Sequence, residues 1–391
     1  MANFAYLNTT WFALIGLLWA GYLFLEGFDF GVAIVAPFVS RDETDKRICL
    51  NAIGPVWDGN EVWLLTAGGA TFAAFPLWYG LLFNGFYLVL FLILLALIVR
   101  GVSFEFRNKV DTASWRRTWD IANFVGSLVP AIVWGAAFTD FIHGVPLGPA
   151  KYSGGVGYTG GLLGAIHPIA IFGGLASLAI FVLHGSLFLS LKTDGDLAER
   201  AHKAVRLSAA VSVALFAGLV AWVATAGRPP VPGQLPLALP VVIGLVALVG
   251  LVAAFGLSER AHYGLAFAAT GTAIMAAMGA VFARMFPAVI PASNAAAKGG
   301  LLIGAAASQH NTLVVMTIVA AIFTPFVLAY QGWTYWVFRK RITRPPSAAA
   351  AATPTPGAGS PESAAVSGEA TVAPGTAASV MTRPAPAAGS A

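Results

Sequence analysis

The sequence predicts an all-α integral membrane protein with about nine transmembrane helices. Apolar residues make up 58% of the 391 residues and charged residues only 10%, whereas soluble domains carry about 25% charged residues. The mean hydropathy is +0.78. The apolar residues are gathered into runs of membrane-spanning length, and the basic residues into the connections between them. These observations together favour a chain that is solvated mainly by lipid.

A helix needs about 20 apolar residues to span the hydrocarbon core of a bilayer. Nine runs meet this requirement, at residues 9–39, 52–74, 76–99, 119–142, 162–191, 206–227, 235–257, 262–283 and 312–338. Only Phe75 and Pro76 separate the second run from the third. We therefore expect a tight turn between two antiparallel helices, because proline does not continue a helix in its interior.

The positions of the Lys and Arg residues predict the orientation of the chain. Most of the 22 fall after the first, third, fifth, seventh and ninth runs, and one of these is Arg100. The other side holds only Lys151, Arg228, Arg284 and Lys298. Because Lys and Arg accumulate in cytoplasmic loops, the N-terminus is predicted outside and the C-terminus in the cytoplasm. A miscounted helix would destroy this alternation, so the alternation supports nine spans.

The last part of the chain has a different composition. Residues 345–391 are rich in Ala, Pro, Gly, Ser and Thr, and such a segment buries too little apolar surface to offset its chain entropy. We expect residues 1–344 to form a polytopic transmembrane domain and residues 345–391 to form a disordered cytoplasmic tail.

Composition also argues against several kinds of protein. Cys49 is the single cysteine, so the chain cannot form an internal disulfide. The net charge of +5 follows from loop topology and does not indicate nucleic-acid binding. No Lys or Arg precedes the first apolar run, which argues against a cleavable signal peptide. The six histidines show no metal-ligand spacing, although a haem held between two separate helices stays open.

Four acidic residues inside the predicted spans are the candidate functional residues. Glu26 and Asp29 lie in the first run, and Asp58 and Glu61 in the second. Each pair has i,i+3 spacing and therefore lies on one helix face. A charge at the centre of a membrane helix costs about 2.5–3.5 kcal/mol, so such residues are usually functional. We expect the two pairs to meet near the cytoplasmic side and to form a path for protons or cations.

Two further residues beside these acids have two interpretations each. Trp57 adjoins Asp58, so it is a candidate for the same path, although membrane tryptophans are ordinarily interfacial anchors. Arg100 is a candidate counter-ion for the acids, but we favour an anchor in the cytoplasmic connection. The acids themselves have an alternative as permanently protonated groups that only hydrogen-bond the helices together.

Several longer motifs resemble subunit II of cytochrome bd-type quinol oxidases. They are GFDFG at 27–31, PVWDGNEVWL at 55–64, TAGGA at 66–70, RGVSFEFR at 100–107, WD at 119–120, GSLVP at 126–130 and GVP at 144–146. The likeness is dense between residues 14 and 147 and weaker beyond. One departure is Gly304-Ala305, where the family often has a Trp-Asp pair.

The resemblance implies nine helices arranged as two four-helix bundles plus one extra helix. It implies a heterodimer with a subunit I that holds haems b and d, oxidises quinol and reduces dioxygen to water. The resemblance also implies location in the bacterial cytoplasmic membrane, no haem in this chain, room for a structural quinone and room for small accessory subunits. In the family an acid beside a tryptophan is part of a cytoplasmic channel toward the haems. It matches Asp58 beside Trp57, and Glu26 and Asp29 match the acids of the first-helix motif.

These expectations form one hypothesis with two alternatives. Cytoplasmic protons would pass Asp58 and then Asp29 or Glu26, and would cross to subunit I. The first alternative is a proton- or cation-coupled secondary transporter that uses the same acids. The second is a purely structural subunit that holds its haem-bearing partner. Neither the type of quinol nor the oxygen route follows from the sequence.

Overall fold

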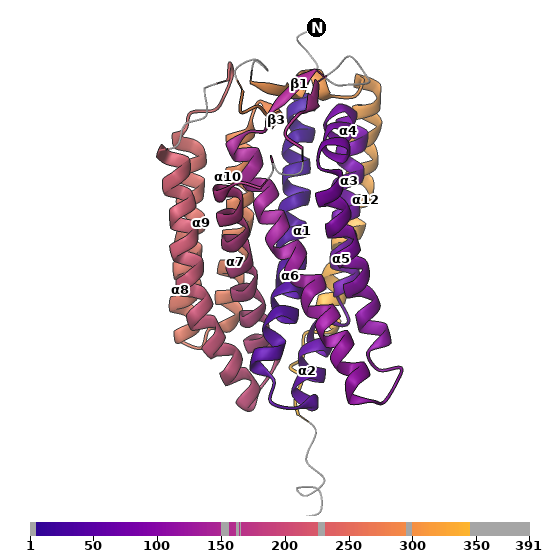
Figure 1. Cartoon of the computed structure of the whole chain (residues 1–391), viewed down its shortest axis with the longest axis vertical. Helices are drawn as coiled ribbons and strands as arrows, with labels where there is room; N and C mark the ends of the chain where they lie inside the picture. The colour runs from indigo at the N-terminus through magenta and orange to yellow at the C-terminus, as the bar shows by residue number, and fades with distance from the viewer. Residues whose placement is uncertain are drawn as a thin grey trace, which may run out of the picture. The chain divides into compact units, whose positions relative to one another are not determined.

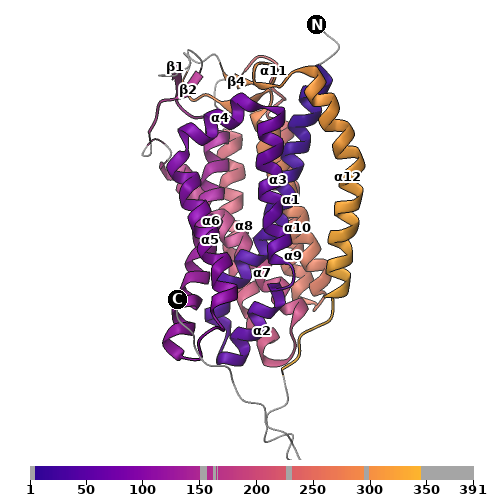
Figure 2. The ribbon, with the colours of Figure 1, turned by 90° about the vertical axis from the view of Figure 1, so that its right-hand side faces the viewer.

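The computed structural model describes residues 5–149, 156–161, 164, 166–225, 231–294 and 299–344. All of these belong to one compact unit, Met1–Arg344. The predicted tail at 345–391 lies outside the described residues. Figures 1 and 2 show the helices of the unit side by side with their axes roughly parallel, as expected for a polytopic membrane protein.

Twelve α-helices are found in the described residues. They are α1 (Ala5–Val39), α2 (Glu43–Ile53), α3 (Trp57–Ala74), α4 (Pro76–Gly85), α5 (Tyr87–Phe106), α6 (Ala113–His143), α7 (Pro168–Lys192), α8 (Gly195–Thr225), α9 (Ala238–Glu259), α10 (Tyr263–Met285), α11 (Ile303–Ala306) and α12 (His310–Val337). Eight of them, namely α1, α5, α6, α7, α8, α9, α10 and α12, are long and apolar enough to cross a membrane. The 18-residue α3 is shorter and more polar. The predicted all-helical membrane fold is confirmed, while its orientation remains a prediction.

The predicted span at 76–99 was wrong in its bounds. Pro76 occupies the first turn of α4, where its missing N–H removes no helical hydrogen bond. The helix ends at Gly85, and after Phe86 the separate helix α5 runs from Tyr87 to Phe106. Arg100 therefore lies inside a helix and not in a loop. Hydropathy ended the run at the first charge, because it cannot recognise an arginine that is neutralised by side chains of other helices.

The first helix lies at the centre of the bundle, and the last lies at its edge (Figures 1 and 2). In the most apolar window of α1, 83% of the residues are buried, against 6% for α12. Glycines let α1 approach α7 closely. A Cβ atom added to Gly31 would lie 1.8 Å from the carbonyl oxygen of Phe181. Gly31 of the GFDFG motif is therefore a helix-packing residue. Small residues commonly have this role at interfaces between membrane helices.

The two ends of the bundle differ. One end, here called the β end, carries the hairpins β1 (Leu147–Pro149) with β2 (Val156–Tyr158) and β3 (Ala288–Pro291) with β4 (Gly300–Leu302). Ser308 also lies there and donates its hydroxyl to the carbonyl oxygen of Ala73 at 2.6 Å. It follows closely after Gly304-Ala305, the dipeptide that stands where a Trp-Asp pair was noted as common. The opposite end, the α2 end, carries α2 and the segment after α12 (Figure 1).

Ion pairs between charged side chains hold together the chain segments at the α2 end. Arg200 binds Asp45 at 2.5 Å, and Arg107 binds Asp120 at 2.6 Å. Asp42 caps α2 by accepting a hydrogen bond from the backbone N–H of Asp45 at 2.9 Å, and it also pairs with Arg344. The Asp45 N–H and the Arg344 guanidinium hold the pKa of the Asp42 carboxyl below its ordinary value.

Candidate functional site

The predicted acids form a cluster where α1, α3 and α5 meet. The side chains of Glu26 and Asp29 have no solvent exposure. Glu61 comes toward them from α3 and is 25% exposed. Asp58 lies one turn earlier on α3 and is exposed on this chain. The cluster therefore runs from an exposed carboxyl to two fully buried ones.

Arg100 is the cation of the cluster. Its side chain is fully buried, it pairs with Glu26, and its guanidinium lies 3.5 Å from a carboxylate oxygen of Glu61. The interpretation of Arg100 as an anchor in a cytoplasmic connection was wrong. A position deep inside α5 needs neutralisation, and carboxylates from two other helices supply it.

Aromatic rings surround the guanidinium. The Arg100 Cζ atom lies 5.0 Å from the ring centre of Phe30, 5.8 Å from that of Trp57 and 5.5 Å from that of Phe104. Trp57 and Phe104 also stack, with their ring centres 4.8 Å apart. These contacts are of the cation–π kind, which strengthens when water is excluded. Trp57 therefore lies against the cation of the cluster as well as beside Asp58 in sequence.

Three polar residues of the site were not among those predicted. Asn60 is fully buried on α3, and its amide nitrogen donates to a carboxylate oxygen of Asp29 at 2.7 Å. Its carbonyl oxygen accepts hydrogen bonds from Gln331 and Tyr335 of α12. The signal in the sequence was a pair of polar side chains with i,i+4 spacing inside an otherwise apolar last span. Sequence alone could not show which helix they face.

The buried acids keep unused hydrogen-bonding capacity. Among the described residues, no protein atom hydrogen-bonds to Glu26 Oε2, Asp29 Oδ1 or the Nε and second terminal nitrogen of Arg100. Buried polar atoms of this kind are uncommon in native proteins and call for an explanation. The two carboxyl oxygens belong to acids that can exchange a proton, so each of these acids keeps one oxygen able to accept a proton.

Other titratable residues lie away from the cluster. Asp120 lies at the α2 end, where Lys46 binds it at 3.0 Å in addition to Arg107. Asp140 lies at the β end, 2.5 Å from the imidazole of His167. Both acids are therefore bound by groups at the ends of the bundle and lie apart from the cluster. No group of three His, Cys, Asp or Glu suited to a metal ion occurs in the part of the chain that the structure describes.

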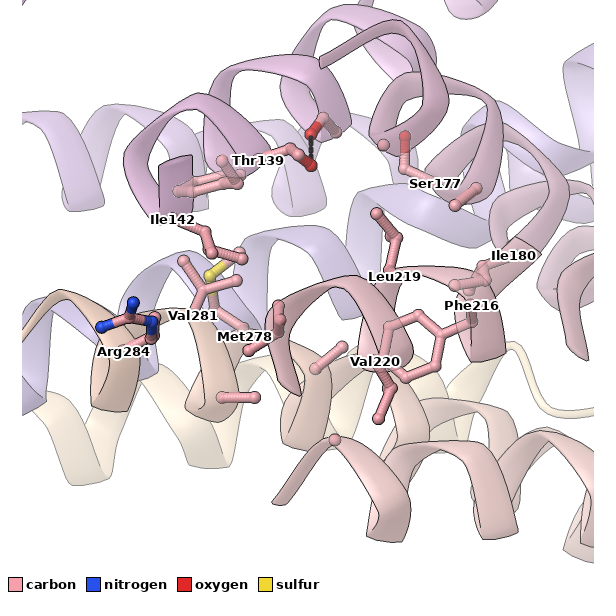
Figure 3. Close-up of a pocket in the computed structure, with 18 of the residues that line it drawn as sticks. Thr139, Ile142, Ser177, Ile180, Phe216, Leu219, Val220, Met278, Val281 and Arg284 are labelled. Carbon is pink, nitrogen blue, oxygen red and sulfur yellow. Dashed lines mark hydrogen bonds between the residues drawn. The ribbon is translucent and has the colours of Figure 1, made fainter. Parts of the chain in front are cut away.

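A second feature is an apolar cavity between α6, α7, α8, α9 and α10. Figure 3 shows Arg284 at one end of it and Phe216 and Ile180 toward the other. Two hydroxyl groups line the cavity, but each already donates a hydrogen bond to a backbone carbonyl oxygen of α6. Thr139 donates to Gly135 at 2.8 Å and Ser177 to Ala131 at 2.5 Å. The cavity therefore suits an apolar chain better than a polar ligand.

The fold and the cluster together define a multi-pass membrane protein with buried ionisable side chains, the arrangement typical of proton and cation pathways. A family model for "Cytochrome bd terminal oxidase subunit II" matches residues 7–338. The chain belongs to this family. It is therefore a subunit of a bd-type quinol oxidase of aerobic respiration, and the predicted family and membrane location are confirmed. Family membership also argues against the transporter alternative.

Individual relatives agree over nearly the full length. The chain is 39% identical to cytochrome bd ubiquinol oxidase subunit 2 of Bacillus subtilis, covering 87% of this chain and 98% of that one. It is 32% identical to cytochrome bd-I ubiquinol oxidase subunit 2 of Escherichia coli, covering 88% and 97%. A chain in the structure of bd oxidase from Geobacillus thermodenitrificans has the same fold, with a TM-score of 0.65 at 16% identity over 85% of this chain and 99% of that one.

Proposed function

We propose that this chain delivers cytoplasmic protons to a haem-bearing subunit I, with which it forms a heterodimer. The observation that carries the proposal is the graded burial of the acids. Asp58 is exposed, Glu61 is partly exposed, and Glu26 and Asp29 are fully buried. A proton path needs an acid that loads from water and further acids that pass the proton inward. The cluster offers both within neighbouring helix turns.

The order of the path follows from the contacts. Asp58 comes first because it is exposed, and Glu61 follows one turn along the same helix face. Arg100 joins Glu61 to Glu26 through its guanidinium, so a change of protonation at one acid is felt electrostatically at the other. Asp29 lies one turn from Glu26 on α1. On this proposal Glu61, one of the four predicted acids, is the intermediate between Asp58 and the buried pair.

The chemistry of the complex then divides between the two subunits. Haems b and d of subunit I would supply the chemistry of dioxygen reduction and would draw protons from the cytoplasm, while quinol oxidation at the outer face would release protons there. A membrane potential builds up without a pump. This chain supplies the intramembrane carboxyls and a large apolar surface for the partner and for lipid, and small accessory subunits are compatible with this arrangement.

We also propose that the apolar cavity holds the tail of a structural quinone. Its lining is made of apolar side chains such as Phe216, Leu219 and Met278, which suit an isoprenoid chain. Arg284 at one end can hydrogen-bond a quinone carbonyl. A quinone bound there would add buried apolar surface and no step of catalysis. Ala277→Phe, which fills the cavity, should release quinone from the purified complex, as measured by extraction and mass spectrometry.

The proton path is tested by Asp58→Asn in the two-subunit complex, with oxygen consumption and haem content measured together. Asparagine keeps the size of the side chain but cannot carry a proton, so turnover should fall about tenfold or more at unchanged haem content. Asp111→Asn is the matched control, because Asp111 is 95% exposed in the connection between α5 and α6. Full turnover in Asp58→Asn would show that the path avoids this residue, and loss of haem would make it structural.

A further inference from the structure

The peripheral helix α12 reaches into the acid cluster through two polar side chains. Tyr335 donates its hydroxyl to the carbonyl oxygen of Asn60 at 2.8 Å, and Gln331 donates its amide to the same oxygen at 3.0 Å. Their i,i+4 spacing places them on one helix face. Most other side chains along this part of α12 are exposed on this chain. The two polar residues therefore form a specific link from α12 to the site.

The contacts of Asn60 are consistent with a single orientation of its carboxamide. Two donors from α12 face the carbonyl oxygen. Two acceptors face the amide nitrogen, the Asp29 carboxylate at 2.7 Å and the Leu25 carbonyl oxygen at 3.4 Å. The reverse orientation would set an oxygen against both acceptors. Asn60 therefore donates an N–H to one carboxylate oxygen of Asp29. The other oxygen of the Asp29 carboxylate has no protein partner and can exchange a proton.

We propose that Asn60, Gln331 and Tyr335 are positioning residues of the proton path, and that they hold one amide donor against Asp29 so that only one carboxyl oxygen exchanges protons. The inference rests on the proposed function. A donated hydrogen bond stabilises the ionised form of a carboxyl, so Asn60 also governs how readily Asp29 releases its proton. The titratable groups that act on Asp29 are Glu26 on its own helix, Glu61 on α3, Arg100 on α5 and Tyr335 on α12.

A purely structural role, in which these hydrogen bonds only hold α12 to the bundle, makes a different prediction. The helix has a second polar attachment, in which the indole N–H of Trp11 donates to the Thr317 hydroxyl at 3.0 Å. Thr317 lies about 21 Å from Gln331 along the helix and has no part in the acid cluster. Thr317→Val is therefore a matched control that weakens the attachment of α12 and leaves Asp29 untouched.

The test measures haem content and the pH profile of oxygen consumption in the two-subunit complex. Asn60→Leu should lower turnover about tenfold at unchanged haem content. It should also move the alkaline limb of the profile to higher pH by about one unit, because Asp29 loses its donor. The double variant Tyr335→Phe with Gln331→Leu should also move the alkaline limb to higher pH, but by less than Asn60→Leu does. Thr317→Val should leave the alkaline limb at its wild-type pH.

Several outcomes would overturn the inference. A wild-type profile in Asn60→Leu would do so, and so would an equal shift in Thr317→Val. If Asn60→Leu fails to assemble, the near-isosteric Tyr335→Phe decides, since it removes a single donor from Asn60. An Asp29→Asn variant separates the two proposals. If Asp29→Asn loses turnover while Asn60→Leu keeps the wild-type turnover and pH profile, only the positioning role is refuted. If both Asp29→Asn and Asp58→Asn keep full turnover, the path itself is refuted.

Discussion

Replacing Arg100 by glutamine should destabilise the protein strongly, because Arg100 is the buried cation that neutralises the cluster. The side chains of Arg100 and Glu26 are both 0% exposed. Removing one partner of a buried ion pair costs about 3–5 kcal/mol. The rings of Phe30, Trp57 and Phe104 would also lose their cation. We therefore expect Arg100→Gln to lower the free energy of unfolding by about 3–5 kcal/mol.

The assay is denaturant unfolding of the purified complex, followed by loss of haem absorbance. Arg116→Gln is the control, because Arg116 pairs with the 95% exposed Asp111 and such surface pairs contribute about 0–1 kcal/mol. The double variant Arg100→Gln with Glu26→Gln should recover part of the loss, since it no longer leaves a buried carboxylate unpaired. Equal stability of Arg100→Gln and Arg116→Gln would refute the role given to Arg100.

The remaining predictions concern packing and pH. Gly31→Ala should destabilise by about 1–3 kcal/mol because its Cβ would meet the Phe181 backbone. Gly68→Ala on α3, where nothing lies within 4 Å, should be neutral or stabilising in the same unfolding assay, and the opposite ranking would contradict the packing. The folded-state pKa of Asp42 is lowered, so its contribution to stability is present above its unfolded pKa and is lost as pH falls through the folded value. Melting curves between about pH 5 and 3 should therefore decline more steeply for the wild type than for Asp42→Asn, and parallel declines would argue against the Arg344 pair.

The sequence was sufficient to find the acids, because charged residues in an apolar run stand out and i,i+3 spacing fixes their common face. It was also sufficient for the turn at Phe75 and Pro76, since proline has a defined place at a helix start. Arg100 was misplaced because hydropathy treats each run alone, whereas its neutralising partners lie on α1 and α3.

Asn60 shows a different limit of the sequence. Its partner Tyr335 is 275 residues away, and no local pattern indicates which of the other helices α12 contacts. The bounds predicted for the third span, 76–99, were wrong for a similar reason. The Leu-rich run 87–99 set the hydropathy maximum, while the break at Phe86 and the extension to Phe106 depend on packing with neighbouring helices. Lateral contacts between helices are thus what the sequence could not supply.

Proton entry at Asp58 is tested most directly by the rate of proton uptake during a single turnover. The fully reduced complex, in detergent with a pH-sensitive dye, is mixed with dioxygen, and Asp58→Asn is compared with the wild type at matched haem content. If protons enter at Asp58, proton uptake from the medium slows about tenfold or more in the variant, while the initial binding of dioxygen keeps its rate. Uptake at the wild-type rate in Asp58→Asn would contradict the claim that protons enter through this chain at Asp58.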